Sequence, residues 1–325
     1  MTPQHLIRIL FLCLTALLAL PGAANAQAGY PNKPIRFIVP FPPGGGAEST
    51  ARLVAQKMSE SMGQPVVVET RAGAGGNIGT EYVARAAADG YTILLATSGM
   101  AIQPNLQQLS WDPVRDFTPI SLIAAYSLVI AVHPSVPART LPELVAYAKA
   151  NPGKLTYGSS GSGGPLHMGA EMFSSQAGVK LLHVPYKGNA PMTLAILGGE
   201  INMVFDSPLG PLPNIRAGKL RALATTGRQR SLALPNTPTV TETGVATLDY
   251  ESWNGVVAPA GTPRDIVQRL NAEVVKAVAT PEVRERLIAL GYEPRSNSVA
   301  EFEAMIASDT RRFATVVKQV GMKLD

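Results

Sequence analysis

A strand, a glycine-rich turn and a helix start follow one another near the beginning of this chain, and this succession constrains the fold most. The apolar segment 35–39 has the pattern of a strand, residues 40–46 (PFPPGGG) form the turn, and a helix begins near Glu48. The prolines and glycines end the strand and leave backbone amides bare at the positive end of the helix dipole. The succession predicts an α/β unit with an anion site at its turn.

The first 26 residues have the pattern of a secretory signal peptide. Arg8 supplies the positive end, residues 9–20 form an apolar run, and Ala24-Asn25-Ala26 matches the A-x-A cleavage pattern. Because the run is shorter than the ~20 residues that a membrane span needs, we expect cleavage and release into the periplasm. The only cysteine, Cys13, lies in this segment. A mature chain starting at Gln27 would therefore have no disulfide, thiol nucleophile or cysteine metal site.

Length and composition favour a protein of two ordinary α/β domains. About 300 residues remain after cleavage, enough for two cores. Glycine (30 residues) and proline (27) are abundant, as expected for many tight connections between strands and helices. The net charge of +5 is spread along the chain without a basic run, which argues against binding to nucleic acid.

Two further glycine-rich turns come before helices in the same way. Residues 71–77 (RAGAGGN) precede one helix, and residues 158–164 (GSSGSGG) follow a strand at 155–157 and precede a helix at 166–176. Strands that alternate with short helices predict parallel pairing with right-handed crossovers. Ligands of such sheets lie beyond the carboxyl ends of the strands. We therefore expect the turns to converge on one cleft.

The turns match no catalytic or nucleotide-binding motif. None continues into Gly-Lys-Ser or Gly-Lys-Thr, and residues 73–79 miss the dinucleotide pattern by one position. Ser160 lacks the second glycine of G-x-S-x-G. His133, His167 and His183 are not spaced as a helical metal pair. The sequence predicts binding without a cofactor, metal or catalytic residue; a hydrolase using Ser160 and His167 is the alternative of a different class.

Three side chains near these turns have two interpretations each, and a fourth, Glu48, has one. His167 either lines the cleft or bonds its own helix start, and Lys187 either counters a carboxylate or is a solvated loop residue. Asp206, at the end of a strand, either binds a donor of the ligand or caps the next segment. Glu48 suits the start of its helix, where a carboxylate interacts favourably with the dipole.

Motifs along the whole chain carry a family resemblance. Residues 30–46, 71–79, 183–188 (HVPYKG) and 258–263 (APAGTP) stand in the order found in the Bug family. The chain resembles these extracytoplasmic receptors of tripartite tricarboxylate transporters, including the TctC type. One difference is Ala47-Glu48, where many members have a Thr-Asp pair.

The resemblance implies an α/β fold of two lobes, a type II-like Venus flytrap, with a mainly parallel sheet flanked by helices in each lobe. One lobe would comprise residues 27–125 and 251–325, and the other residues 126–250. The ligand cleft would lie between them, and the hinge crossings would lie near Ala125 and Glu251.

The resemblance also implies a solute-binding protein, not an enzyme. It would capture a small carboxylate (a dicarboxylate or tricarboxylate, an acidic amino acid or an aromatic acid) for permease subunits in the membrane, as a monomer. The alternative is a periplasmic subunit that signals to a membrane sensor. The expected ligand contacts combine the family positions with His167 at its helix start: Phe41, Pro43, Gly44, Gly45, Gly46, Gly75, Asn77, Thr97, Ser98, Ser159, Ser160, Gly161, Gly163, His167, Tyr186, Lys187 and Asp206.

Overall fold

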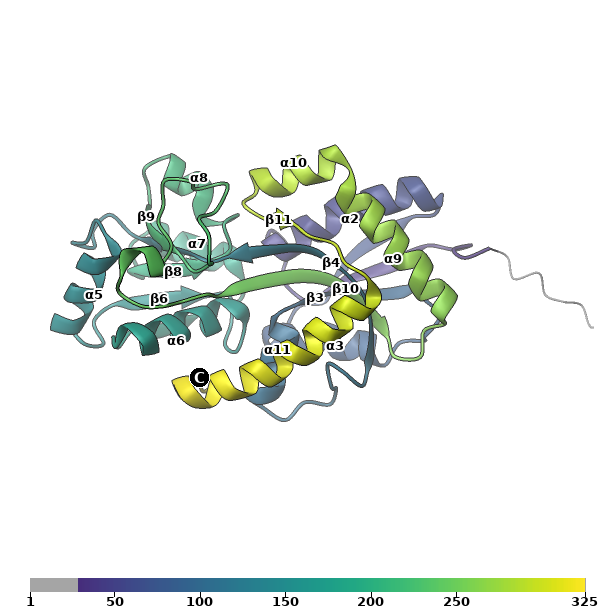
Figure 1. Cartoon of the computed structure of the whole chain (residues 1–325), viewed down its shortest axis with the longest axis horizontal. Helices are drawn as coiled ribbons and strands as arrows, with labels where there is room; N and C mark the ends of the chain where they lie inside the picture. Colours follow the sequence, from purple (N-terminus) through teal and green to yellow (C-terminus); the bar gives the residue numbers. More distant parts are fainter. Residues whose placement is uncertain (1–28, 325) are drawn as a thin grey trace, which may run out of the picture.

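The computed structural model describes residues 29–324, which form two α/β lobes side by side along the longest axis (Figure 1). The predicted signal peptide, residues 1–26, lies outside the described residues. Within the described part of the chain, every helix is too short or too polar to cross a membrane.

The sheet of the first lobe has the strand order β11-β4-β10-β3-β1-β2. Its helix α2 (Gly46–Met62) buries Val54, Ala55 and Met58 at helical spacing and ends at Gly63, whose left-handed conformation suits glycine. The strands are β1 (Ile35–Val39), β2 (Val66–Thr70), β3 (Thr92–Thr97), β4 (Phe117–Ser127), β10 (Glu251–Pro259) and β11 (Glu293–Pro294). The other helices are α3 (Asn77–Ala84), α4 (Gly99–Ile102), α9 (Arg264–Ala279), α10 (Pro281–Ala289) and α11 (Val299–Val320).

The sheet of the second lobe has the order β7-β6-β8-β5-β9. Tyr157 and Phe205, on neighbouring strands, are fully buried in its core. The strands are β5 (Val129–Val132), β6 (Thr156–Ser159), β7 (Leu182–Pro185), β8 (Met203–Asp206) and β9 (Arg221–Thr225). The helices are α5 (Leu141–Ala150), α6 (Pro165–Ala177), α7 (Asn189–Leu197) and α8 (Pro211–Arg216).

The two-lobed α/β fold agrees with the expectation, but both sheets are mixed and not mainly parallel. β1 is parallel to β2 and β3, whereas β10 is antiparallel to β3 and β4. β6 is parallel to β7 and β8, whereas β5 is antiparallel to β8 and β9. Only Leu128 separates β4 from β5. Because no crossover helix joins these two strands, the alternation of strands and helices does not predict their direction.

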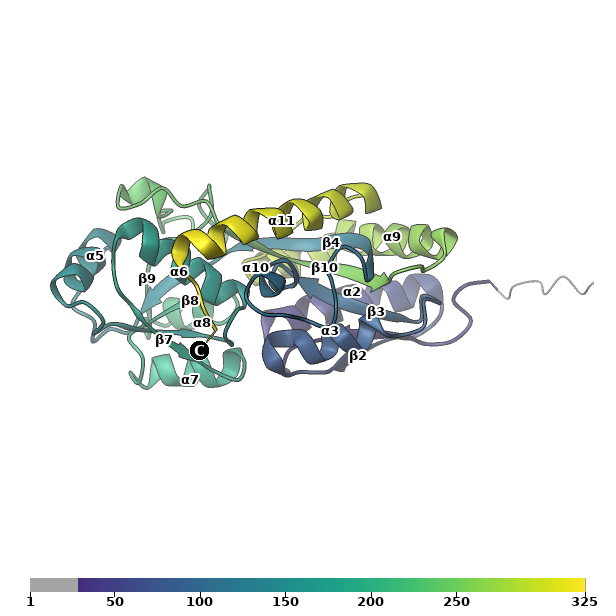
Figure 2. The ribbon, with the colours of Figure 1, turned by 90° about the horizontal axis from the view of Figure 1, so that it is seen from below.

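The segments that cross between the sheets are tied together. Thr226 accepts a hydrogen bond from the Leu128 amide at 2.9 Å and donates one to the Tyr250 carbonyl at 2.7 Å. Helix α11 runs lengthwise along both lobes (Figure 2) and contacts β4 and α4 in the first lobe and α6 in the second. The two lobes are therefore joined by the crossing strands and by one long C-terminal helix.

Candidate functional site

Three helices begin at one pocket between the lobes. Gly46 of α2 comes from the first lobe, and Pro165 of α6 and Asn189 of α7 come from the second. The caps of these helices, Gly45, Gly164 and Gly188, have no side chain to satisfy the first amides. The pocket is lined by Phe41, Gly45, Gly46, Ala47, Thr97, Tyr126, Ser160, Pro165, Leu166, Asn189, Ser207 and Tyr292. This lining contains no lysine or arginine, so helix dipoles and backbone amides are its source of positive potential.

The first glycine turn is held by the acid that follows it. The Gly44 amide donates to Glu48 Oε2 at 2.7 Å, and Arg52 pairs with Glu48 Oε1 at 2.6 Å. Burial opposes ionisation of Glu48, but the bonds from Gly44 and Arg52 hold its pKa below the ordinary value. The Gly44 amide is thus occupied within the chain. Pro43 is exposed, and neither Pro43 nor Gly44 is among the residues that line this pocket.

The second and third turns touch each other across the lobes. Gln103 Nε2 donates to the Ser162 carbonyl at 3.4 Å, and a Cβ on Gly161 would lie 4.0 Å from Gly75 Cα. Gly75 and Asn77 line a second cavity, which shares Phe41 and Thr97 with the pocket. Bringing these turns together closes the cleft on this side.

We expect Gly75→Ala to weaken ligand binding by holding the lobes apart. The new Cβ would lie 2.8 Å from Gln103 Nε2 and 3.2 Å from the Ser162 carbonyl. Gly153→Ala is the matched control, because Gly153 also has a positive φ (74°, against 64° at Gly75) but open space around its Cβ position. Calorimetry should show an affinity loss of about tenfold or more for Gly75→Ala alone. Equal affinities of both variants would contradict closure through this contact.

Two stacked histidines support the third turn from beneath. The rings of His167 and His183 lie 3.8 Å apart, and His167 is only 3% exposed. The Gly163 amide donates to His167 Nδ1 at 3.2 Å, and Ser159 Oγ lies 2.7 Å from His183 Nε2. Ser159, Gly161, Gly163 and His167 were expected to contact the ligand, but they are not among the residues that line the pocket. Ser160 is the residue of this turn that lines the pocket.

Other expected contacts also lie outside the lining. Ser98 is fully buried, and its hydroxyl lies 2.8 Å from that of Ser252 on β10. Tyr186 is half-buried and donates its amide to the Ser159 carbonyl, and Lys187 is exposed. Tyr186 and Lys187 thus flank the third turn, Ser98 is bonded within the first lobe, and Thr97 lines the pocket. Within residues 29–324, no group of histidine, cysteine or acidic side chains is arranged to hold a metal.

Asp206 lies directly behind the pocket and positions two residues that line it. It is 1% exposed, and its Oδ1 accepts from Asn189 Nδ2 at 2.7 Å and from Ser207 Oγ at 3.4 Å. Burial raises the pKa of this carboxyl to about 7, against the opposing hydrogen bonds from Ser207 and Asn189. No ion pair with Asp206 occurs in the described part of the chain. Asp206 thus acts on the pocket through Asn189 and Ser207.

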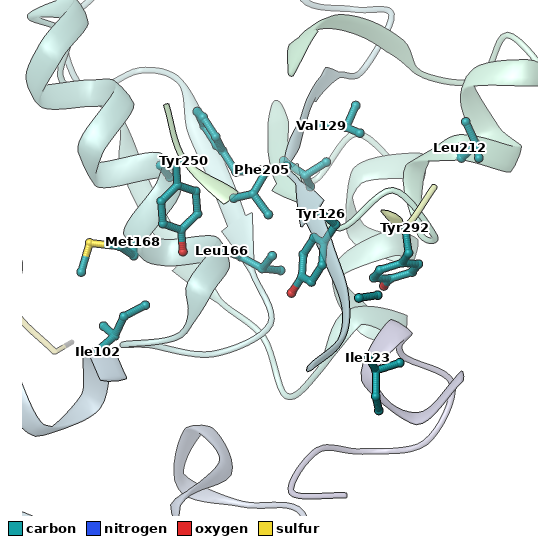
Figure 3. Packing of buried hydrophobic residues seen from close by; sticks show 14 of the residues in the cluster. Ile102, Ile123, Tyr126, Val129, Leu166, Met168, Phe205, Leu212, Tyr250 and Tyr292 are labelled. Carbon is teal, nitrogen blue, oxygen red and sulfur yellow. The ribbon is translucent and has the colours of Figure 1, made fainter. Parts of the chain in front are cut away.

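Sequence reasoning missed several lining residues. Tyr126 and Tyr292 pack edge to face with ring centroids 5.0 Å apart, and Leu166 lies opposite Tyr126 (Figure 3). Tyr126 ends a long strand and Tyr292 directly precedes the two-residue β11, so no local motif marks either. Asn189 had a usable signal, because it follows Gly188 at a helix start as in the other turns.

Comparisons with known proteins agree on one family. The family model described as "Tripartite tricarboxylate transporter family receptor" matches residues 50–322. The periplasmic binding protein BugD is 33% identical, with a TM-score of 0.86 over 91% of this chain and 100% of that one. Rpa4515 of R. palustris, solved with adipate, is 34% identical, with a TM-score of 0.87 over 91% and 100%. MatC of Rhodopseudomonas palustris, solved with bound malate, is 28% identical, with a TM-score of 0.82 over 89% and 100%.

Proposed function

Because the chain belongs to the family of tripartite tricarboxylate transporter receptors, we propose that it captures a small organic carboxylate in the periplasm for permease subunits in the membrane. The observation that carries this proposal is the pocket where α2, α6 and α7 begin. Amides at helix starts bind an anion without a buried cation. The absence of lysine and arginine from the lining fits a ligand held by the backbone and by water.

Aliphatic dicarboxylates are the first ligands to test. Relatives of similar fold are solved with adipate and with malate. The pocket offers polar groups from Thr97, Asn189 and Ser207 beside the apolar rings of Phe41 and Tyr292. A few placed polar groups on an apolar wall are typical of small-ligand sites.

Binding is proposed to close the cleft between lobe 1 (residues 27–125 and 251–325) and lobe 2 (residues 126–250). The strands that cross at Leu128 and at Glu251 would absorb the rotation, in a monomeric receptor. Closure removes water from the ligand and strengthens its hydrogen bonds to the amides. Gly45 and Asn189 lie close together across the cleft, since a Cβ on Gly45 would lie 3.4 Å from Asn189 Oδ1.

A thermal-shift screen across carboxylates tests the proposal. Adipate, malate, citrate, glutamate and benzoate would be compared with the matching neutral amides. At roughly a hundred times Kd, a bound acid should add about 2.7 kcal/mol to the free energy of unfolding and raise the Tm. The amides should add little, because the helix dipoles favour negative charge. A chain that responds to no acid, or equally to acids and amides, would contradict carboxylate binding.

Ester hydrolysis is the control for catalysis. The protein would be incubated with esters of the acids that bind, and the Ser160→Ala variant would be assayed beside it. We expect no turnover in either sample, because His183 is bonded to Ser159 and His167 accepts from the Gly163 amide. Turnover by the wild type that Ser160→Ala abolishes would contradict the receptor proposal and indicate a hydrolase.

A further inference from the structure

A second cavity adjoins the carboxylate pocket behind Phe41. The two share Phe41 and Thr97, and Phe41 packs against Gly76, where a Cβ would lie 3.3 Å from the ring. The second cavity extends between β3, α3 and α4 in the first lobe. It therefore continues the pocket into one lobe and does not open a separate site.

The wall of this cavity is apolar, with one unmet polar atom. Leu94 and Met100 contribute hydrocarbon surface. Trp111 lines the cavity, is 4% exposed, and its Nε1 has no hydrogen-bond partner within the described part of the chain. The ring is fixed edge to face against Phe117 at a centroid distance of 6.0 Å. Since a buried N–H group without an acceptor destabilises the fold, a rigid, unmatched donor is expected to have an acceptor that the chain itself does not supply.

Other polar side chains of the cavity have hydrogen-bond partners within the chain. Thr80 Oγ1 donates to the Gly76 carbonyl at 2.9 Å. Gln103 Oε1 accepts from Gln107 at 2.6 Å and from Asn77 at 3.4 Å. Helix α3 begins at Asn77 in the same wall, so the positive end of its dipole lies at this cavity.

We propose that this cavity is the far subsite of the ligand pocket, in which Trp111 Nε1 donates to the second carboxylate of an elongated dicarboxylate. The inference rests on the proposed function and adds the length and the two-ended chemistry of the ligand. The first carboxylate lies at the starts of α2, α6 and α7, the methylene chain passes the Phe41 ring, and Leu94 and Met100 contact the chain beyond it. The side chain of Phe41 turns aside to join the two cavities.

Calorimetry on Trp111→Phe tests the subsite. Phenylalanine keeps an aromatic ring and removes the donor. Succinate, adipate and suberate would be compared with butanoate, hexanoate and octanoate on the wild-type chain and on the variant. We expect the wild type to bind a longer diacid more tightly than succinate and more tightly than the monoacid of the same chain length. Trp111→Phe should lower the affinity for that diacid by about tenfold or more, and the affinity for the monoacid by less than about twofold.

Trp253→Phe is the matched control, because its Nε1 donates to Asp309 Oδ2 at 2.8 Å and lies outside both cavities. A diacid affinity that is unchanged in Trp111→Phe, or a loss shared equally by diacid and monoacid, would overturn the subsite while leaving carboxylate binding in place. Wild-type binding of short acids only would overturn it as well. If no acid bound to the wild type, the result would instead contradict the proposed function, carboxylate binding itself.

Discussion

Gly46→Ala is expected to destabilise the first lobe and to abolish measurable ligand binding. A Cβ at this position would overlap the Tyr292 hydroxyl and lie 2.9 Å from its Cζ. Tyr292 is 2% exposed and packs against Tyr126, so the ring has no free space to enter. Overpacking of this kind lowers the free energy of unfolding by about 1–3 kcal/mol. If the start of α2 moved to relieve this overlap, the amides of α2 would be withdrawn from the pocket.

The neighbouring glycine gives a matched control for this prediction. A Cβ on Gly45 would meet Asn189 Oδ1 at 3.4 Å, an ordinary contact, so Gly45→Ala should leave the unfolding curve nearly unchanged. Urea denaturation and calorimetry on both variants would show the difference. The double variant Gly46→Ala, Tyr292→Phe should regain part of the lost stability, because it removes the overlapping oxygen. Equal stability of Gly45→Ala and Gly46→Ala would show that Tyr292 does not limit this position.

The glycine turns were predictable because each depends on neighbouring residues in the sequence. Residues 40–46 and 158–164 stand between a strand and a helix start, and their composition alone marks the change of direction. The resulting positions of α2 and α6 could therefore be expected. The direction of β4, β5 and β10 could not, because it depends on pairing across the sheet and not on the local pattern.

The chemistry of the pocket wall was predictable only in part. Phe41, Gly45 and Gly46 line the pocket because they belong to a recognisable turn. His167 also lies at a turn, yet its ring faces inward to stack on His183, which depends on packing between α6 and β7. Tyr292 comes from a segment without any motif, far away in the sequence. The sequence thus indicates where the backbone approaches the ligand, whereas tertiary packing decides which side chains complete the wall.

Asp206 places a titratable group behind the proposed carboxylate pocket. Its carboxyl is buried, and burial raises its pKa well above the ordinary value of an aspartate, to about 7. The rings of Tyr126 and Tyr292 also face this region; burial is the main cause of their raised pKa values, and Asp206 adds to the rise. No basic side chain compensates the carboxylate, since the described residues show no ion pair with it. Ionised Asp206 would therefore repel an anionic ligand in the pocket.

The free energy of unfolding of the wild type should fall between about pH 4 and pH 7, and Asp206→Asn should not show this fall. The folded-state pKa lies above the unfolded value, so the contribution of protonated Asp206 is complete below the unfolded pKa and is lost as the pH rises through about 7. At roughly 1.4 kcal/mol per pKa unit, the loss amounts to about 4 kcal/mol. Asparagine keeps an oxygen to accept from Asn189 and does not titrate. Urea denaturation should therefore show that the free energy of unfolding of the variant increases relative to that of the wild type as the pH rises from 4 to 8.

Asp116→Asn provides the opposite case, because Arg115 holds the pKa of Asp116 below its ordinary value despite partial burial. Asp116 is fully ionised above low pH, so the difference in stability between Asp116→Asn and the wild type should stay constant from pH 5 to pH 8.

Ligand affinity adds a second readout for Asp206. An anion in the pocket favours protonated Asp206, so wild-type affinity should fall above pH 7 while the affinity of Asp206→Asn stays level. Parallel pH profiles of the wild type and Asp206→Asn, in stability and in affinity alike, would mean that this carboxyl remains ionised when folded. Its negative charge would then need a compensating group, and the pocket would owe its anion selectivity to more than the helix starts.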